Sequence, residues 1–439
     1  MTKVRCFSRA LTQHVFLRRA CQYRYPSRQS RSFFQYGYIE GVEDLEDYKP
    51  GGYHPIHIDD RLHQRYRIVH KLGHGTFSTA WLALDEKTSN YVAIKVGTAD
   101  ADSREADILS KLVIGAAAVS AGSPAADKAS MVPPVIDRFC IAGPNGTHPC
   151  FVTSPASCSV RESKEASGWY LFQLNVARSL CAQLAMAICF IHSEGYAHGD
   201  LHLGNLYAKF GAPQREPIIR TDGEPIPIPG VPSYAVPSAW LGIASDKITL
   251  SDAKLLLSDS GVAFRPSDKS RFVSYTPLRM RAPEAFFEPT TPLSFPSDIW
   301  SLGCAIFELL GHRSLIDESL APPDEITAQQ VHLQGLMPAE WLNRWEERST
   351  WFDDAGRPLG NECDIWSWDR RFEEWLQELR RHCGMDVIGE EEKAALLNLL
   401  RWMLAWKPEE RPSAEEVLET VWMKKWALPA YEQGRKAWV

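Results

Sequence analysis

The stretch His198-Gly-Asp-Leu-His-Leu-Gly-Asn205 decides the fold and the chemistry of this chain. Asp200 is followed by Asn205 on a short turn, which comes after an apolar run typical of a buried helix, Leu180 to His192. That spacing can bring one carboxylate to a hydroxyl group and one amide oxygen to a Mg²⁺ ion bound to phosphate. A lone Asp and Asn in a loop is more often ordinary turn chemistry. The interpretation therefore depends on partners elsewhere in the sequence.

The composition is that of a soluble globular protein, with 44% hydrophobic and 23% charged residues among 439. The net charge of −7 provides no overall positive charge to attract phosphate backbones, so we expect no direct binding of nucleic acid. The ten cysteines form no Cys-x-x-Cys pair, which predicts reduced thiols and an intracellular protein. The longest apolar run, Leu180 to Ile191, is too short to cross a bilayer and predicts a buried helix rather than a transmembrane segment.

The N-terminal extension, residues 1–40, is strongly basic. It contains eight Lys and Arg residues, and no acidic residue precedes Glu40. Apolar residues at helical spacing between Val4 and Val15 would form a stripe, so the segment has the composition of a mitochondrial transit peptide. A disordered basic tail and a misassigned start of the reading frame fit the same composition, and both alternatives stay open.

Strand-like runs come first along the chain. Residues 65–69, 79–83 and 91–96 are rich in β-branched and aromatic side chains and predict three strands, while residues 103–112 predict a helix. Residues 115–130 are rich in Ala, Ser and Gly, and we expect an extended surface connection there.

Helix-like runs dominate the second half, beginning with a long helix at residues 171–192. Seven prolines crowd residues 211–245, which predicts an irregular insert, and residues 254–257 predict a strand after it. Residues 298–310 are apolar on all sides and predict a buried central helix, and further helices run to Trp426. This order predicts an α+β fold with a small, mostly β N-lobe and a large α-helical C-lobe.

A glycine-rich turn lies between the first two predicted strands. Gly73 and Gly75, with Ser78 where a third glycine often occurs, let backbone N–H groups approach phosphate oxygens without a clash. A pair of glycines alone is more often a plain hairpin turn. Lys95 follows at the centre of the third strand, where a buried amine needs a phosphate and a carboxylate as partners.

Glu105, on the next predicted helix, is the expected carboxylate for the strand lysine, and Asp107 is the second choice. With Glu105 in this role, Ile108 and Leu109 would face the core of the lobe. A second metal-binding carboxylate is needed as well. Asp259, in the run Ser-Asp-Ser-Gly after an apolar segment, supplies it, although a single Asp-x-Gly is a common turn.

An ordered set of these motifs covers about residues 66–426 and resembles a eukaryotic protein kinase. The set is Gly73-x-Gly75, Val92-Ala-Ile-Lys95, Glu105, His198-x-Asp200 with Asn205, Asp259-x-Gly261, Ala282-Pro-Glu284, Asp298-Ile-Trp-Ser-Leu-Gly303 and Arg411-Pro412. Among kinases the chain looks like the SR-protein kinase family of the CMGC group, particularly its divergent fungal members. This narrower resemblance is carried by Gly51-Gly-Tyr-His-Pro-Ile-His57, by Leu72-Gly-x-Gly-x-Phe-Ser-Thr-Ala-Trp81 and by the long insert before Asp259.

The resemblance implies a bilobal protein-kinase-like fold, with an N-lobe of about residues 66–155, a C-lobe of about 156–426 and a C-terminal tail, 427–439. It also implies an active Ser/Thr protein kinase that uses ATP and Mg²⁺. The implied location is the cytoplasm or nucleus, or the mitochondrion if the basic N-terminus is a transit peptide.

Functional roles follow from the resemblance position by position. Lys95 would hold the α- and β-phosphates and pair with Glu105, and Asp200 would orient and deprotonate the acceptor hydroxyl. Asn205 and Asp259 would hold Mg²⁺. The residues implied in nucleotide binding are Leu72, Gly73, Gly75, Ser78, Ala80, Ala93, Lys95, Thr153 near the gatekeeper position and, in the hinge 154–156, Pro155. Two structural roles are implied as well: Asp298 would brace the catalytic loop, and Glu284 would form a buried ion pair with Arg411.

The chain departs from the kinase pattern at several positions. Gly199 replaces an Arg that clamps a phosphorylated activation segment, so control by such a phosphate is doubtful. His202 replaces a Lys that neutralises the γ-phosphate, and a neutral imidazole would supply one hydrogen bond but little charge. Ser260 replaces an apolar residue that links the lobes. Thr276 lies one residue farther from Ala282 than the usual substrate-facing Thr, and Met280 occurs where a Tyr is common, so the preferred acceptor residue stays open.

Three functions are therefore compared. The leading hypothesis is the active protein kinase. The second is a nucleotide-binding pseudokinase or scaffold. The third is a small-molecule phosphotransferase, because the sequence His198 to Asn205 is equally typical of that class of enzyme. Arg/Ser-rich protein substrates are suggested by the resemblance, and a monomer is expected. Such substrates would need an acidic surface, for which the candidates are Glu340, Glu346, Glu347, Asp353 and Asp354, although a solvated charged face explains the same residues.

Overall fold

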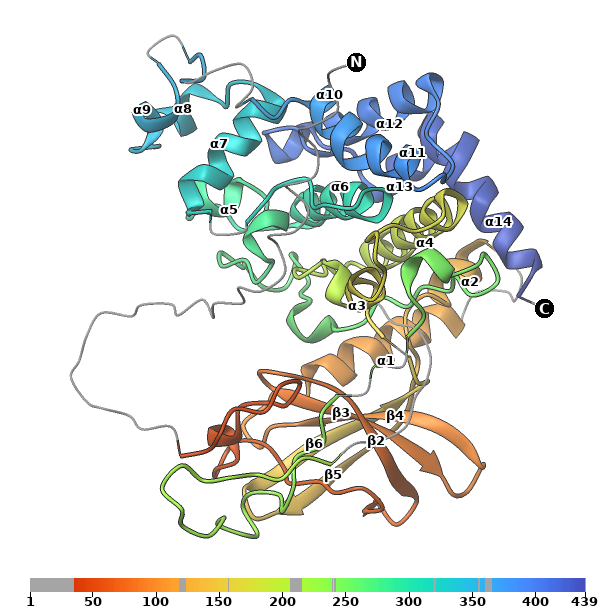
Figure 1. The fold of residues 1–439 in the computed structure, drawn as a ribbon, viewed down its shortest axis with the longest axis vertical. Helices are drawn as coiled ribbons and strands as arrows, with labels where there is room; N and C mark the ends of the chain where they lie inside the picture. Colours follow the sequence, from red (N-terminus) through yellow and green to blue (C-terminus); the bar gives the residue numbers. More distant parts are fainter. Residues whose placement is uncertain are drawn as a thin grey trace, which may run out of the picture.

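The chain has a strand-rich part, residues 35–153, and a helical part that begins at residue 160, and we call these the N-lobe and the C-lobe (Figure 1). The computed structural model describes residues 35–117, 124–156, 158–205, 215–238, 240, 242–318, 321–353, 356–359 and 365–438. Residues 1–34 of the N-terminal extension, predicted at 1–40, and Asp354 lie outside the described residues. The backbone of Asn205 is described, but its side chain is not.

A six-stranded antiparallel sheet forms the N-lobe, in the order β1-β2-β3-β4-β6-β5. Its strands are β1 (Arg61–Leu62), β2 (Tyr66–Gly75), β3 (Ser78–Asp85), β4 (Asn90–Gly97), β5 (Val135–Gly143) and β6 (Gly146–Thr153). The three predicted strands are confirmed as β2, β3 and β4. Gly75 occurs at the tight turn between β2 and β3, and Gly146 at the tight turn between β5 and β6. The sheet begins at Arg61, ahead of the predicted domain boundary at residue 66.

The register of the sheet separates two faces. Lys95 lies opposite Ala80 on β3, and Ala93 lies opposite Thr153 on β6, so these four residues project to one face. Residues one position away project to the other face, where Ile56 and other apolar side chains pack into a core of their own. The face that carries Lys95 is therefore left for helix α1 and the C-lobe.

Helices make up the C-lobe, and α4 (Leu174–Ser193) and α6 (Phe295–Leu310) form its centre. Helix α4 is long and apolar enough to cross a membrane by length and composition, but 89% of its most apolar window is buried inside the protein, as in a core helix. Helix α1 (Arg104–Ala117) lies beside the sheet, and α2 (Pro124–Ala129) packs against α4 and α1. The other helices are α3 (Val160–Glu165), α5 (Glu284–Phe287), α7 (Pro323–Gln334), α8 (Ala339–Leu342), α9 (Arg348–Trp351), α10 (Trp368–Arg371), α11 (Glu378–His382), α12 (Glu390–Met403), α13 (Ala414–Glu419) and α14 (Leu428–Lys436).

Three predicted segments differ from the structure. The connection predicted at 115–130 contains helix α2, since Pro124 suits a first helical turn and the Ala-rich residues after it favour a helix. The strand predicted at 254–257 pairs with no strand of the sheet. It is extended, but its backbone bonds to the Gln183 side chain and to Met131 instead. The predicted C-terminal tail forms α14, because Ala430 and Tyr431 bury an apolar face on the C-lobe.

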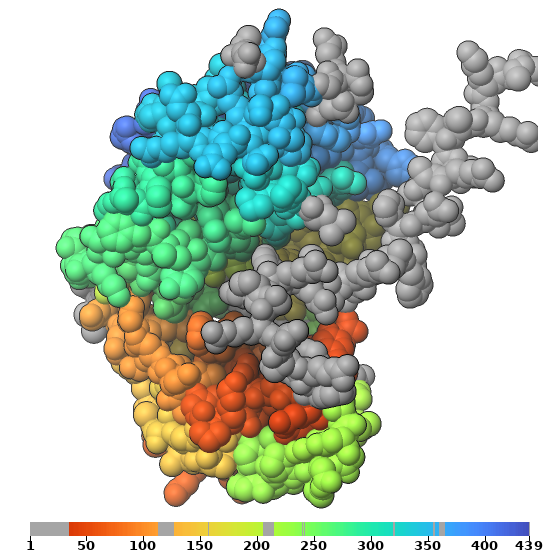
Figure 2. Space-filling view, turned by 90° about the vertical axis from the view of Figure 1, so that its left-hand side faces the viewer, coloured from red at the N-terminus to blue at the C-terminus, as the bar shows by residue number. Residues whose placement is uncertain are grey.

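The proline-rich insert is irregular, as predicted, but it is packed rather than loose. Residues 215–238 contain no helix or sheet strand, and they lie against residues 35–60, which we call the strap (Figures 1 and 2). One isolated bridge, between Tyr36 and Arg220, and a shared apolar cluster join the two segments. The cluster contains Tyr36, Leu45, Tyr48, Tyr53, Ile218, Val231 and Ala235. Residues 215–238, between the catalytic loop and Asp259, therefore pack on the N-lobe.

Candidate active site

Lys95 joins the N-lobe to the C-lobe at the face of the sheet described above. Its ammonium lies 2.7 Å from Glu105 Oε2 on α1 and 3.0 Å from Asp259 Oδ1. The predicted choice of Glu105 is confirmed, since Asp107 points elsewhere and binds Arg138 at 2.6 Å. Burial disfavours the charged amine, but the two carboxylates outweigh it and raise the pKa of Lys95. Lys95 is therefore a fixed positive charge at neutral pH.

Asp259 occupies a left-handed backbone conformation with a φ of 64°, which is costly for a residue other than glycine. The positive charge of Lys95 is the largest cause that lowers the pKa of Asp259, so its carboxylate is ionised. About half of this side chain is exposed, which leaves oxygen available to a cation. One carboxylate and an amide such as Asn205 are the donors that Mg²⁺ accepts when phosphates and water complete its shell. The residues present fit this ion.

The catalytic loop is held by a buried carboxylate on α6. Asp298 accepts hydrogen bonds from the backbone N–H groups of His198, at 2.6 Å, and Gly199, at 2.9 Å. The His192 ring lies 3.0 Å from the same carboxylate. Burial opposes ionisation of Asp298, but these bonds outweigh it and lower its pKa. The predicted brace is confirmed, and it fixes the backbone that carries Asp200.

Asp200 directly follows the backbone that Asp298 holds, and the charge of Asp259 acts on it. Burial is the largest cause that raises its pKa from 3.8 to about 6; the charge of His198 opposes the rise, and that of Asp259 adds to it. A raised pKa brings a carboxylate closer to the pKa expected of a general base at neutral pH.

Most of the residues predicted to bind nucleotide lie on the Lys95 face of the sheet or in the turn between β2 and β3. Gly73 lies opposite Ala80, and Gly75 opposite Ser78, so the turn of Thr76 and Phe77 joins β2 to β3. A side chain added at either glycine would meet no atom within 4 Å, so the space above the turn is open to a ligand. Leu72 precedes the turn at a β-bulge. Thr153 ends β6, and Pro155 follows it in the hinge.

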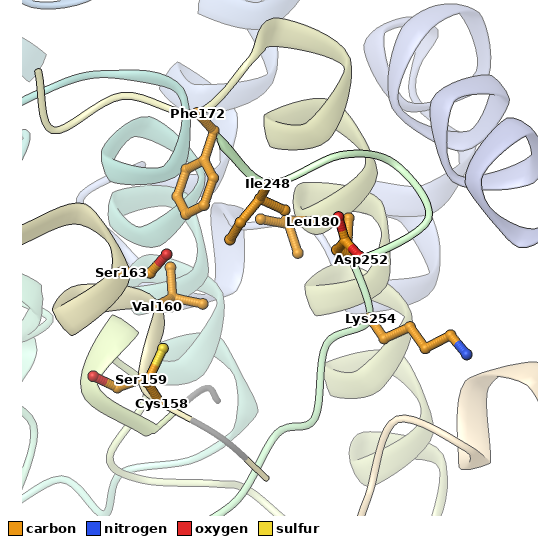
Figure 3. Close-up of a pocket in the computed structure, with 10 residues that line it drawn as sticks. Cys158, Ser159, Val160, Ser163, Phe172, Leu180, Ile248, Asp252 and Lys254 are labelled. Atoms are coloured by element: carbon orange, nitrogen blue, oxygen red, sulfur yellow. The ribbon is translucent and has the colours of Figure 1, made fainter. Parts of the chain in front are cut away.

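A small cavity lies next to the residues that follow the hinge, beside Cys158 and Ser159 (Figure 3), and neither Lys95 nor Asp200 lines it. Its volume is about 20 Å³, close to the space of one water molecule. Val160, Phe172 and Ile248 line it, whereas the Lys254 side chain extends away from it (Figure 3). The cavity is therefore too small for a nucleotide.

Similarity to known proteins agrees with this geometry. The model of the protein kinase domain family matches residues 244–423. A serine/threonine protein kinase of Aspergillus fumigatus is 26% identical over 390 residues, which cover 87% of this chain and 90% of that protein. The serine/threonine-protein kinase SRPK of Physarum polycephalum is 26% identical over 412 residues, which cover 87% and 91%. SRSF protein kinase 3 of Homo sapiens is 30% identical over 168 residues, 38% of this chain and 29% of that protein.

These similarities support a protein kinase of the SR-protein kinase type. In this kinase, residue 202 of the catalytic loop is a neutral histidine. Burial, followed by the charge of Arg161, lowers the pKa of His202 to about 4. The N–H of Gly204 donates to His202 Nδ1 at 3.0 Å, so the proton of the neutral ring is on Nε2. That nitrogen lies 3.7 Å from Asp200 Oδ1. The ring can therefore donate a hydrogen bond beside Asp200 but adds no charge.

Gly199 makes room for an arginine of the activation segment, residues 259–284. Its φ is +76°, and an added Cβ would lie 3.3 Å from Arg271 Nη1 and 3.4 Å from the Val262 carbonyl oxygen. The Arg271 guanidinium donates to that carbonyl and packs over the Phe264 ring, 4.4 Å from its centroid. The Arg271 guanidinium of the activation segment therefore lies beside Gly199, the position at which the catalytic loop lacks an arginine of its own. The sequence patterns did not identify Arg271.

Ser260 is buried beside α1, with 1% of its surface exposed. Among the described residues its hydroxyl has no hydrogen-bond partner. A buried hydroxyl without a partner is less favourable than an apolar side chain of similar size. A hydroxyl therefore lies at the position where the resemblance implies an apolar link between the lobes.

Proposed function

We propose that this kinase transfers the γ-phosphate of ATP to Ser or Thr hydroxyls of proteins, with the residues above in the roles that the motifs predict. The observation that carries the proposal is the joining of Lys95 to both Glu105 and Asp259, next to a catalytic loop braced by Asp298. This arrangement sets a positive charge, a metal-binding carboxylate and a base around one point. Phosphoryl transfer depends mainly on such positioning and on charge stabilisation.

In this proposal the two lobes close on ATP from opposite sides. The backbone of residues 154–156 would bind adenine, and Lys95 would bind the α- and β-phosphates. Asp259 and Asn205 would hold Mg²⁺, which neutralises charge on the phosphates when it is bound. Asp200 would accept the proton of the acceptor hydroxyl, and His202 would donate its Nε2 hydrogen to an oxygen beside it.

We expect acidic pH to reduce transfer. The base must be ionised to accept a proton, so kcat/KM falls as pH drops through the pKa of Asp200 and is level above it. Burial raises that pKa to about 6, and Mg²⁺ bound at Asp259 would remove the smaller effect of that charge. The acid limb should therefore have an apparent pKa between about 4 and 6. Nucleotide affinity measured at each pH is the control; a kcat/KM that rises toward low pH contradicts the assignment.

We also propose that Arg/Ser-rich segments are the preferred protein substrates. The similarity to kinases named for SR proteins supports this, together with the net charge of −7. The expected acidic surface is smaller than the sequence suggests, because Lys407 pairs with Glu340 and Arg357 pairs with Asp353. Glu346 and Glu347, both exposed, are the remaining described candidates.

A peptide screen tests the reaction and the substrate class together. We expect an Arg-Ser repeat peptide to be phosphorylated with a kcat/KM at least about tenfold above that of a Ser-Pro peptide of equal length, a difference of ~1.4 kcal/mol. Equal rates would remove the preference and leave the kinase activity. Nucleotide binding without transfer to any peptide would favour the pseudokinase, and transfer to a small alcohol alone would favour the small-molecule phosphotransferase.

A further inference from the structure

A tyrosine of the strap contacts the glycine-rich turn from outside the cleft. The Tyr53 hydroxyl donates to the Gly75 carbonyl oxygen at 2.8 Å and lies 3.3 Å from that of Thr76. The side chain is almost fully buried, with 4% of the residue exposed. Burial, followed by the charge of Glu43, raises the pKa of Tyr53 to about 12, so the hydroxyl is a donor at neutral pH.

Two glycines place Tyr53 under the turn. Gly51 has a φ of +89°, which a residue with a side chain rarely adopts. A Cβ on Gly52 would lie 1.9 Å from the Asp47 carbonyl oxygen, so only glycine fits there. The Tyr53 N–H donates to the same Asp47 carbonyl at 3.0 Å. The run Gly51-Gly-Tyr53 therefore forms a tight bend that fixes the direction of the tyrosine ring.

The strap is anchored on both sides of this bend. The Asn145 side chain donates to the Tyr53 carbonyl oxygen at 2.8 Å and to the Gly230 carbonyl oxygen of the insert at 2.7 Å. Before the bend, Glu43 pairs with Lys71, and both side chains are at most 2% exposed. Lys71 directly precedes the turn on β2. A buried pair tolerates little displacement, because separating the charges leaves them unpaired in a medium of low dielectric.

The strap lies on the face of the sheet opposite Lys95. Lys71 pairs across the sheet with Trp81, and Trp81 with Ile94, which projects away from the neighbouring Lys95. In a trans peptide the C=O and the following N–H point in opposite directions. A Gly75 carbonyl held by the strap therefore directs the Thr76 N–H away from the strap, toward the side where phosphates would bind.

We propose that Tyr53 is a positioning residue for the phosphate-binding turn, and that the strap and insert together hold it in place. The hydroxyl fixes one peptide plane of the turn before nucleotide binds, so less conformational freedom is lost on binding. The effect acts through Gly75 and Thr76 and involves no contact between Tyr53 and the nucleotide. The inference rests on the proposed function, since it assigns the turn to ATP phosphates.

Tyr53→Phe tests the proposal, with Tyr234→Phe as the matched control. Tyr234 lies in the insert, where its hydroxyl accepts a hydrogen bond from the Ile58 N–H at 3.1 Å and, among the described residues, makes no hydrogen bond to the glycine-rich turn. Each variant removes one hydroxyl. For Tyr53→Phe we expect the KM for ATP and the dissociation constant of Mg–ATP to rise about three- to tenfold, as for one lost hydrogen bond. The peptide KM should stay unchanged, and Tyr234→Phe should match the wild type.

Adenosine separates positioning of the turn from a general structural effect, because it lacks phosphates. We expect Tyr53→Phe to bind adenosine as tightly as the wild type while its affinity for Mg–ATP falls. Equal losses for adenosine and Mg–ATP, or an unchanged affinity for both, would overturn the proposal. A wild-type protein that binds Mg–ATP without transferring phosphate would contradict the proposed function instead, and the binding comparison would still test Tyr53.

Discussion

Replacing Asp200 with Asn is expected to lower kcat for peptide phosphorylation by about 10²- to 10⁴-fold while the binding of Mg–ATP stays intact. Asn has nearly the same shape as Asp, but its amide cannot accept the proton of the acceptor hydroxyl. The brace is unaffected, because Asp298 bonds to the backbone N–H groups of His198 and Gly199 and not to this side chain. The loss should therefore appear in the chemical step, measured as phosphate transfer at saturating ATP and peptide.

Asp107→Asn is the matched control for this variant. Asp107 was the second choice for the carboxylate that pairs with Lys95, and the structure excludes it. Its side chain is half exposed and pairs with Arg138 at the surface. The same chemical change there should leave kcat and KM near those of the wild type, since exposed ion pairs contribute little. If Asp200→Asn keeps most of its activity, the assignment of the base is wrong.

Features that depend on one motif residue and one neighbouring element were predicted correctly. The Lys95–Glu105 pair, the brace at Asp298 and the Glu284–Arg411 pair are all present. For Glu105, the period of the helix was decisive: it directs Ile108 and Leu109 to the core and leaves Asp107 on the outside. Such periodicity is visible in the sequence because it is local.

Features that depend on packing between distant segments were missed. Tyr53 belongs to the run Gly51 to His57, which indicated the family resemblance but predicted no contact. Its hydrogen bond to Gly75 exists because the strap folds back over β2. Arg271 is one of many arginines, and its place beside Gly199 depends on the path of the activation segment. Neither residue has a local pattern that separates it from a solvated side chain.

The mispredicted elements have the same cause. Residues 254–257 have the composition of a strand, but the Gln183 side chain on α4 takes up the Leu255 N–H, and no neighbouring strand is needed. Helix α14 lies after Trp426, beyond the residues that the kinase motifs cover, so those motifs do not predict it. The helix is stabilised by packing on the surface of the C-lobe. Trp438, which follows the helix, adds a hydrogen bond from its ring nitrogen to the Leu250 carbonyl oxygen at 3.1 Å.

Breaking the ion pair at the end of the activation segment is expected to cost the most stability. Arg411 is fully buried and donates to both oxygens of Glu284, at 2.8 and 2.7 Å, and its guanidinium lies 5.0 Å from the Trp300 ring centroid. Arg411→Met keeps a long apolar side chain against that ring but leaves the carboxylate buried without its partner. We expect the free energy of unfolding to fall by about 3–5 kcal/mol, measured by denaturant titration.

The double variant Glu284→Gln, Arg411→Met separates the lost charge pair from lost packing. With no charge left in the site, it should be more stable than Arg411→Met alone, because the penalty of an unpaired buried carboxylate is removed. Lys425→Ala serves as the surface control; its pair with Glu391 is more than half exposed, and no measurable change is expected. A double variant as unstable as the single one would mean that the guanidinium acts through its bonds to the Ala405 and Trp406 carbonyl oxygens, and not through its charge on Glu284.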